Sequence, residues 1–416
     1  MIQKPRGTQD FLPNEMIKRR YVEERMRETF KSFGYREVQT PTFEHLELFT
    51  AKSGEGIIEE LYAFKDKGGR SIALRPELTA PVIRLYVEKL QMNPKPLKLF
   101  YFGNCFRYDR PQKGRYREFT QAGCELIGVD SPAALAELIA LAWSVLKNAG
   151  LKNMVLRIGN LDFISTVFDE LGIKDELRKS ILTFIDKKQF DDLKIFLEET
   201  GFSKEKINKL ITFFSCKNME ELKGFVRNEN IVKPFEQTLE FLPLFGIDTY
   251  VVDASIVRGL DYYLGLVFEI EAPTLGAERQ LCGGGCYELV SLFGGKPVAT
   301  AGFAIGFDRT IVALENEGYR FPEKRLKAYV IPVETKVLPY ALKVVKGCRD
   351  ANIPVDVDLT GRNLAKSLKY ANSRGVEKVI IVGEKERKEN NVTVKDMETG
   401  KQYSVSVKEI INVLRD

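Results

Sequence analysis

The sequence predicts two domains: a large α+β domain with an antiparallel sheet over about residues 1–320, and a small α/β domain over 326–416. The chain has 416 residues, and a single hydrophobic core rarely grows beyond about 250–300 residues. From about 161 to 232, apolar residues recur at three- and four-residue spacing, which predicts a helical insertion between strand-rich stretches. After a polar stretch at 316–325, strands and helices alternate, as in a small α/β unit with a mostly parallel sheet.

Before the insertion, the first predicted element is an amphipathic helix over 16–33, which Gly34 ends. The strand predicted over 35–44 is interrupted by Pro41, so it belongs at a sheet edge or an interface. The further elements are a strand from Leu97, its antiparallel return over 119–128, a helix over 131–150 with Ser131 and Pro132 at its start and Gly150 at its end, and a strand over 154–159.

After the insertion, apolar and glycine-rich runs predict that strands resume and that one helix follows. The strands are predicted at 249–257, 263–272 and within 281–295, and the helix at 306–318. In the small domain the predicted elements are strands at 328–334, 355–359 and 378–384, helices at 338–352 and 364–375, a hairpin over 392–405 that turns at Thr399 and Gly400, and a last helix over 407–416.

Composition predicts a soluble protein without a membrane span. Apolar residues make up 44% of the chain and charged residues 29%, and the net charge is +5. There is no signal peptide and no run of 18 or more apolar residues, so we expect a cytoplasmic protein. The six dispersed cysteines are then expected to be reduced thiols.

His45 is the only histidine, which excludes histidine-based triads and histidine-rich metal sites. Cys282 and Cys286 flank three glycines, but no second Cys/His pair completes a zinc site, so no protein metal ligand is assigned. The chemistry must therefore depend on Arg, Glu, Gln, Tyr and the backbone.

The stretch RPQKGRYREFTQAGCE, residues 110–125, follows Arg107 and begins with four Lys/Arg among eight residues. Clustered guanidinium groups favour phosphate, although a solvated basic turn has the same composition. LRPELTAP (74–81) and QAGCE (121–125) each place a carboxylate among small residues, where it is costly unless a cation or hydrogen bond meets it. Two further motifs stand out, RGLDYYLGLVFEI (258–270) and GFAIGFDRTI (302–311). Taken alone, the first is also explained by a packed strand end and the second by a structural turn.

Taken together and in this order, these motifs resemble those of the histidyl-tRNA synthetases, which are class II aminoacyl-tRNA synthetases. RGLDYY and LCGGG followed by a tyrosine are similar to the two peptides peculiar to the family. TPTFE, FRYDRPQKGRYREFTQAGCE and GFAIGFDR are similar to class II motifs 1, 2 and 3. The resemblance runs from PRGTQDFLP to VTVKDMETG. It implies the class II synthetase fold, an antiparallel catalytic domain that carries the helical insertion, with a C-terminal α/β anticodon-binding domain.

The resemblance also implies activity and partners. The protein would use ATP and Mg²⁺ to activate L-histidine as histidyl-adenylate, transfer histidine to the 3′ end of its tRNA, and work as a homodimer with the motif 1 helix and the Pro41 strand at the interface. Because a site that bonds both imidazole nitrogens rejects other amino acids strongly, no editing domain is required.

Individual residues receive roles by the same resemblance. Arg107 would grip the α-phosphate of ATP, Arg309 would pack on the adenine and the triphosphate, and Arg115 would also contact ATP. The implied histidine-binding residues are Glu125 and Tyr263 at the two ring nitrogens, Glu77, Thr79 and Gln121 at the α-ammonium, Tyr287 closing the pocket, and Arg258 and Tyr262 beside them. Arg258 is expected to be catalytic, because a fixed cation aimed at the developing phosphoryl charge lowers the barrier. The implied contacts to the acceptor end of the tRNA are Gln112, Lys113 and Arg117.

The sequence departs from the family pattern in places: Cys286 stands where arginine is common, Leu78 where glycine is common, and Asp308 where the wider class often has glutamate. Two alternatives are a prolyl or threonyl enzyme, which should lack RGLDYY, and a non-catalytic histidine-sensing regulatory paralogue of histidine biosynthesis. That paralogue usually lacks the C-terminal domain and the catalytic arginine, and both are present here.

Overall fold

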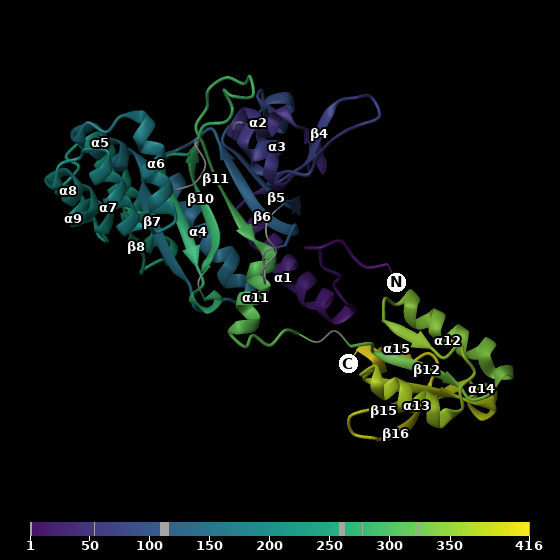
Figure 1. The fold of residues 1–416 in the computed structure, drawn as a ribbon. Coiled ribbons are helices and arrows are strands. Elements are labelled where there is room, and N and C mark those ends of the chain that lie inside the picture. Colours follow the sequence, from purple (N-terminus) through teal and green to yellow (C-terminus); the bar gives the residue numbers. More distant parts are fainter. Residues whose placement is uncertain are drawn as a thin grey trace. The chain divides into compact units, whose positions relative to one another are not determined.

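A computed structural model of the chain describes residues 2–53, 55–108, 116–257, 263–276, 278–322 and 325–415. The chain forms two compact units, Met1–Phe321 and Pro322–Asp416 (Figure 1). Within the described ranges, no helix is both long and apolar enough to cross a membrane. The six cysteines all lie in these ranges, and none forms a disulfide.

An eight-stranded sheet forms the centre of the first unit, in the order β1-β5-β6-β11-β10-β9-β7-β8. Its strands are β1 (Arg36–Glu37), β5 (Leu97–Phe106), β6 (Glu118–Ile127), β7 (Val155–Asn160), β8 (Val251–Val252), β9 (Tyr263–Glu271), β10 (Gln280–Tyr287) and β11 (Thr300–Gly306). The pairings from β5 to β7 are antiparallel, and only the two-residue edge strands β1 and β8 pair in parallel. The predicted antiparallel sheet is therefore confirmed.

Long helices cover one face of this sheet: α1 (Pro13–Ser32), α4 (Pro132–Ala149) and α11 (Phe307–Asn316). The ring of Phe30 in α1 stacks on Phe100 of β5 and Phe303 of β11, with centroids 5.0 and 5.9 Å apart. Helix α4 begins and ends as predicted, because Ser131 Oγ accepts the Ala134 amide and Gly150 leaves the helix at a φ of 120° that favours glycine.

The opposite face of β5 and β6 carries the polar residues of interest. Successive side chains of a strand point to opposite faces. Phe100 and Cys124 pack in the helix-covered core, whereas Leu99 and Tyr101 pack with Leu78 in a separate cluster beneath helix α3. By this alternation, the odd-numbered positions of β6 face the same side as Tyr101. The elements over this side are α2 (Glu47–Ser53), α3 (Thr79–Leu85), a following π turn (Tyr86–Leu90), a 3₁₀ turn (Glu55–Glu60), and a small sheet of β2 (Phe43–His45), β4 (Ser71–Leu74) and β3 (Ala63–Lys65).

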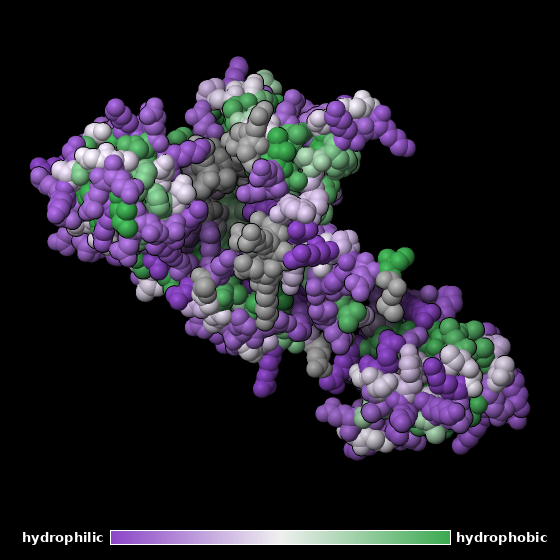
Figure 2. Space-filling view, in the orientation of Figure 1, coloured by the Kyte–Doolittle hydropathy of each residue, from purple (hydrophilic) through white to green (hydrophobic). Residues whose placement is uncertain are grey.

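The helical insertion begins where it was predicted and runs further. Its helices are α5 (Leu161–Leu171), α6 (Asp175–Asp186), α7 (Phe190–Glu199), α8 (Lys204–Ser215), α9 (Met219–Lys223) and α10 (Glu229–Phe241), followed by a 3₁₀ turn at Pro243–Phe245. Each of α5 to α10 contributes buried apolar side chains to the core, and hydrophilic side chains cover most of the visible surface of the insertion (Figure 2).

The second unit has a five-stranded sheet in the order β13-β12-β14-β15-β16. Its elements are β12 (Ala328–Pro332), α12 (Leu338–Asp350), β13 (Val355–Val357), α13 (Leu364–Ser373), β14 (Lys378–Val382), α14 (Glu384–Glu389), β15 (Asn391–Asp396), β16 (Gln402–Ser406) and α15 (Ile410–Arg415), with a 3₁₀ turn at Thr335–Val337. β12 pairs in parallel with β13 and β14, and the terminal hairpin adds two antiparallel strands.

Several predicted boundaries were wrong for local reasons. The strand predicted over 249–257 is only the two residues of β8, because the chain turns at Asp253, whose carbonyl accepts the Ile256 amide. The strand predicted over 35–44 is divided into β1 and β2 around Pro41. Residues 288–295 form turns instead of a strand, and α2, α3 and α14 were not predicted.

Candidate active site

A cavity of about 780 Å³ opens on the first unit, over the central strands and the start of α11. The side chains around it come from elements far apart in the sequence. Arg107 lies at the end of β5, Gln121 in β6, and Arg309 in the first turn of α11. Two predicted ATP-binding arginines therefore line one cavity together with a predicted histidine-binding residue.

Arg107 is fixed by its surroundings at the mouth of the β5–β6 hairpin. Its amide donates to the Arg117 carbonyl at 2.9 Å, and its Nε donates to the Pro76 carbonyl at 2.9 Å. The guanidinium lies 5.2 Å from the ring centroid of Phe119. As far as the described residues extend, the terminal nitrogens remain for an oxyanion, which suits a planar fork.

Arg309 is held across the cavity by Glu278. Its Nη1 lies 3.0 Å from Glu278 Oε2, and its Nη2 donates to the Glu278 carbonyl. Its Nε is buried and meets no acceptor among the described residues. The Glu278 contact was not predicted, and an anionic ligand would compete for the same guanidinium.

A buried ion pair fixes the helix turn that carries Arg309. Asp308 is 5% exposed; its Oδ1 accepts from Arg19 Nη1 at 2.6 Å and its Oδ2 from the Thr120 amide at 2.6 Å. The Arg19 guanidinium lies between the rings of Phe11 and Phe307, 3.8 and 4.8 Å from their centroids. Strand β6, helix α1 and helix α11 are thereby joined directly beneath the cavity.

An Asp308→Ala variant is expected to be strongly destabilised. Removing one partner leaves the buried Arg19 charge uncompensated, which costs about 3–5 kcal/mol of unfolding free energy. Thermal unfolding measures the loss. Lys18→Ala is the matched control, because it breaks the exposed Lys18–Glu315 pair between the same two helices, and such pairs contribute about 0–1 kcal/mol. Equal shifts in the two variants would contradict the prediction.

Glu125, in the middle of β6, is the most deeply buried carboxylate of the site, at 1% exposure. The Tyr101 hydroxyl donates to Oε1 at 3.0 Å, and the Tyr287 hydroxyl donates to Oε2. Burial raises the pKa of Glu125 to about 8, although hydrogen bonds from Tyr287, Thr79 and Tyr101 lower it in part. Gly302 faces Glu125 on β11, where a Cβ would collide with Oε2, so glycine is required there.

The other predicted histidine-binding residues lie around this carboxylate. Glu77 accepts the Thr79 and Ala80 amides at 2.6 and 3.1 Å, at the start of α3. Gln121 Oε1 accepts the Leu78 amide at 3.2 Å. The Thr79 hydroxyl lies 3.4 Å from the Tyr101 hydroxyl, and the Tyr263 ring packs edge-on against Tyr287 with centroids 6.4 Å apart.

Tyr101 was not predicted as a site residue, because it lies within the apolar run LKLFYFGNCF. The available signal was Gly123, its partner across β5 and β6, where a Cβ would lie 2.6 Å from the Tyr101 hydroxyl. A glycine inside a strand often marks such a close approach.

Other predicted residues stand apart from this site or outside the described residues. The Arg117 amide donates to the Gly7 carbonyl at 2.8 Å and its guanidinium lies 3.9 Å from the Tyr108 ring centroid, and it does not line the cavity. The predicted residues outside the described ranges are Gln112, Lys113, Arg115, Arg258 and Tyr262. No group of three or more His, Cys, Asp or Glu suited to a metal ion occurs in the described part of the chain.

The raised pKa of Glu125 predicts a pH dependence of stability. The unfolded carboxyl loses its proton near its ordinary pKa of 4.5, whereas the folded one keeps it up to about 8. Between these values the folded state binds more protons, so the stabilisation present below the lower pKa is lost as pH rises through the window. Melting temperatures measured from pH 4 to 9 should show this decline in the wild type and lack it in Glu125→Gln. A wild-type curve parallel to that of the variant would contradict the assignment.

A family model described as histidyl-tRNA synthetase matches residues 7–310, and one described as an anticodon-binding domain matches residues 327–416. The chain is 46% identical over 413 residues to a histidine–tRNA ligase of Methanosarcina acetivorans, covering 99% of this chain and 98% of the relative. It superposes on the apo histidyl-tRNA synthetase of S. aureus with a TM-score of 0.79 at 33% identity, over 100% of both chains. It also resembles a Bacillus halodurans protein described as an ATP phosphoribosyltransferase regulatory subunit/histidyl-tRNA synthetase, with a TM-score of 0.80 at 26% identity, over 92% of this chain and 98% of that one.

Proposed function

The chain belongs to the histidyl-tRNA synthetase family, and we propose that it activates L-histidine with ATP and transfers it to the 3′ end of the tRNA for histidine. The observation that carries this function is Glu125 on strand β6, a buried carboxylate held by two tyrosine hydroxyls, and the same strand carries Gln121 into the cavity lined by Arg107 and Arg309. The proposed catalytic domain spans about residues 1–320, with an insertion from 161 that was expected to end near 232, and the anticodon-binding domain spans about 326–416.

Histidine is recognised by the Glu125 cluster. Glu125 and Tyr263 bond the two imidazole nitrogens, Tyr287 and Tyr262 enclose the ring, and the α-ammonium is bound by Glu77, Thr79 and Gln121. Tyr101 and Tyr287 support this assignment, because their hydrogen bonds fix the orientation of the Glu125 carboxylate before the ligand arrives. An amino acid without ring nitrogens would leave these buried groups unpaired, which gives discrimination of about 10⁴–10⁵.

ATP occupies the arginine-lined cavity. Arg107 binds the α-phosphate, Arg115 adds a contact, and Arg309 packs on the adenine and the triphosphate after exchanging its contact with Glu278. The cavity would accommodate Mg²⁺ bound mainly to the phosphates of ATP. Carboxylates line its wall, and magnesium typically needs only one or two carboxylate ligands from the protein. Glu269 on β9 lines this wall and accepts from Gln280 at 3.0 Å, and it would hold the ion there, although the sequence had indicated no protein ligand for a metal. When bound, the ion would neutralise negative charge on the phosphates of ATP.

The histidine carboxylate attacks the α-phosphorus and pyrophosphate leaves, with Arg258 stabilising the charge on the non-bridging oxygens. The terminal ribose hydroxyl of the tRNA then attacks the carbonyl of the adenylate, and AMP leaves. Gln112, Lys113 and Arg117 contact the acceptor end, where phosphates favour basic side chains.

The proposed assembly is a cytoplasmic homodimer. The small sheet beside Pro41 supports it, because Phe43 and Phe64 share one face and are 55% and 49% exposed. Exposed apolar surface on a sheet is typical of an interface.

The histidine-sensing regulatory paralogue remains the second candidate, and the Bacillus halodurans likeness is the observation that bears on it. Against it, the chain keeps Arg107 and Arg309 at one cavity and has a second unit that matches the anticodon-binding domain model. The Methanosarcina acetivorans relative is also the more similar protein, at 46% against 26% identity.

ATP–pyrophosphate exchange with each of the twenty amino acids, in the presence of Mg²⁺, tests the function. Exchange with histidine alone is the expected result. Histidine binding without exchange would favour the regulatory paralogue, and exchange with another amino acid would refute the proposed pocket.

A further inference from the structure

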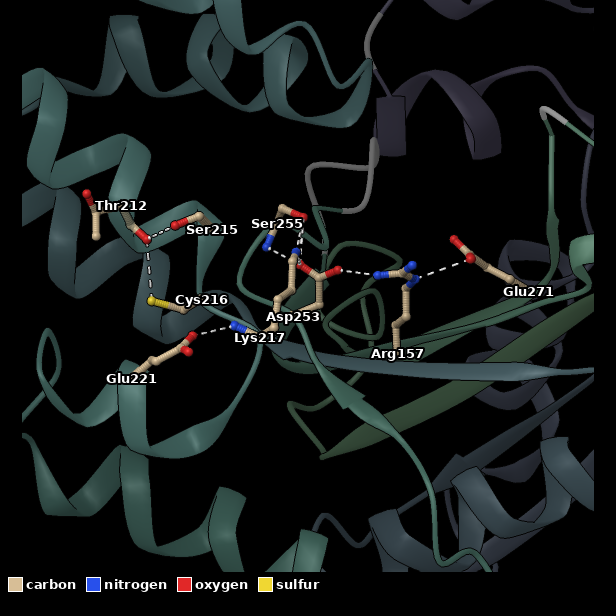
Figure 3. A network of polar contacts seen from close by, with 9 residues as sticks. All are labelled: Arg157, Thr212, Ser215, Cys216, Lys217, Glu221, Asp253, Ser255 and Glu271. Carbon is tan, nitrogen blue, oxygen red and sulfur yellow. Dashed lines mark hydrogen bonds and ion pairs between the residues drawn. The ribbon is translucent and has the colours of Figure 1, made fainter.

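A network of polar side chains connects the helical insertion to the wall of the cavity (Figure 3). Its centre is Asp253, which follows the short strand β8 and is 3% exposed. Figure 3 shows Lys217, from the loop between α8 and α9, on one side of Asp253 and Arg157, from β7, on the other. None of these residues was predicted to have a function.

Asp253 is held as an anion by donors from three segments. Its Oδ1 accepts from Lys217 Nζ at 2.5 Å, and from the Ser255 amide and hydroxyl at 2.9 and 2.6 Å. Its Oδ2 accepts from Arg157 Nη1 at 2.8 Å. Burial by itself would raise the pKa of Asp253, but the hydrogen bonds from Lys217 and Ser255 outweigh it, so the pKa is lowered.

Lys217 belongs to the insertion and reaches out of it. Its amide donates to Glu221 Oε2 at 2.8 Å, which fixes the loop before α9. The neighbouring Cys216 carbonyl accepts the Ala254 amide at 3.4 Å, so the insertion touches the Asp253 turn through backbone as well as side chain. A displacement of α8 and α9 would therefore act on this turn directly.

The other side of the network is the cavity itself. Ser255, Ile256 and Val257 line the cavity, as do Asp253 and Arg157. Val257 is followed in the sequence by Arg258, the first residue of RGLDYY. Arg157 Nε also lies 3.2 Å from Glu271 Oε2 at the end of β9, which completes the connection to the central sheet.

We propose that Asp253 is a positioning residue that holds the segment leading into Arg258, and that Lys217 makes this hold depend on the helical insertion. The inference rests on the proposed function, because it assigns a route by which the insertion acts on adenylate formation. Positioning of reacting groups contributes much of catalysis, and small displacements are costly. The buried carboxylate of Asp253 is suited to this role, because the loss of one hydrogen-bond donor weakens the positions of the other groups bonded to it.

Histidine-dependent ATP–pyrophosphate exchange by full-length variants tests the proposal. Lys217→Met should lower kcat about 5- to 20-fold, a usual range for coupling between sites, while KM for ATP changes less than about twofold. Asp253→Asn should lower kcat about 10- to 100-fold. The double variant should have a kcat only slightly below that of Asp253→Asn alone, because both changes break the same contact between Lys217 and Asp253. Lys217→Arg, which keeps the charge, should retain about half of the wild-type kcat.

Lys209→Met is the matched control, because it breaks the Lys209–Glu170 pair at 3.1 Å within the insertion and away from Asp253. A Lys217→Met kcat equal to that of Lys209→Met, or a lowered melting temperature without a change in kcat, would overturn the proposal. If the wild type exchanges with no amino acid, the proposed function fails instead. In that case, amide hydrogen exchange at residues 253–257 tests the connection. Exchange should be faster in Lys217→Met than in the wild type and unchanged in Lys209→Met. Equal exchange rates in the two variants would overturn the proposal.

Discussion

An Arg258→Ala variant is expected to form histidyl-adenylate about 10²–10³-fold more slowly than the wild type, with histidine affinity nearly unchanged. The α-phosphoryl group gains charge on its non-bridging oxygens only as the histidine carboxylate attacks. A cation aimed at those oxygens therefore stabilises the transition state more than the ground state, so its loss lowers kcat and leaves substrate binding intact. Single-turnover formation of adenylate at saturating ATP measures the rate, and calorimetric titration measures histidine affinity.

Two further variants make this result specific. Arg258→Lys keeps the charge without the planar fork and should fall between the wild type and Arg258→Ala. Arg70→Ala is a matched control that removes an exposed guanidinium paired with Asp66 at 2.7 Å, and it should not affect the rate. A near-normal rate in Arg258→Ala, or an equal loss of histidine affinity and rate, would refute the catalytic assignment.

Above pH 8, where Glu125 is ionised, Glu125→Gln is expected to lower kcat/KM for histidine about 10- to 100-fold, because a hydrogen bond to a charged group contributes about 1.5–3 kcal/mol. The amide has the same shape but offers one acceptor oxygen instead of two. Tyr101 and Tyr287 both donate to Glu125 in the wild type, so the amide cannot satisfy both hydroxyls and a ring N–H of the substrate. KM for ATP should stay the same, since the arginines of the cavity are untouched. Steady-state exchange kinetics with histidine and ATP varied in turn separate the two constants.

The control for Glu125→Gln is Glu137→Gln on α4, which breaks the partly exposed pair between Glu137 and Lys98 at 2.6 Å. Tyr101→Phe removes one hydroxyl that orients Glu125 and should cause a smaller loss of kcat/KM for histidine, of about 3- to 10-fold. An unchanged KM for histidine in Glu125→Gln would mean that the ring is not bound by this carboxylate.

An element was predicted well where neighbouring residues determine its ends, and poorly where tertiary contacts determine them. Helix α4 was predicted to the residue, because Ser131, Pro132 and Gly150 are local signals that act whatever the helix packs against. Strand β8 was predicted too long, because the apolar run TYVVDASIV continues past a turn that forms through tertiary contacts of Asp253 with Arg157 and Lys217. The insertion ends beyond 232 because α10 packs against α4 to bury one more stripe, which periodicity alone did not locate.

For the site as well, residues in short motifs were predicted, and residues brought in by tertiary contacts were not. Glu77, Gln121 and Glu125 were predicted from the resemblance to bind histidine, and the structure places their side chains in one group of hydrogen-bonded residues with Thr79 and Tyr101. Tyr101 could not be found from spacing, because only the register that pairs it with Gly123 turns its hydroxyl towards Glu125. Glu278 and Asp253 were missed for the same reason: each contacts a residue at least 31 positions away in the sequence.

The sequence by itself determined the division into an antiparallel α+β unit, a helical insertion and a small α/β unit, together with the chemical types of the site residues. These depend on periodicity, capping residues and short motifs, which act over a few neighbouring residues. Only the tertiary structure decided which tyrosines hold Glu125, that Glu278 engages Arg309, and that Lys217 of the insertion bonds Asp253. Such contacts depend on strand register and on packing between distant segments, because a hydrogen bond requires its atoms to be placed within a few tenths of an ångström.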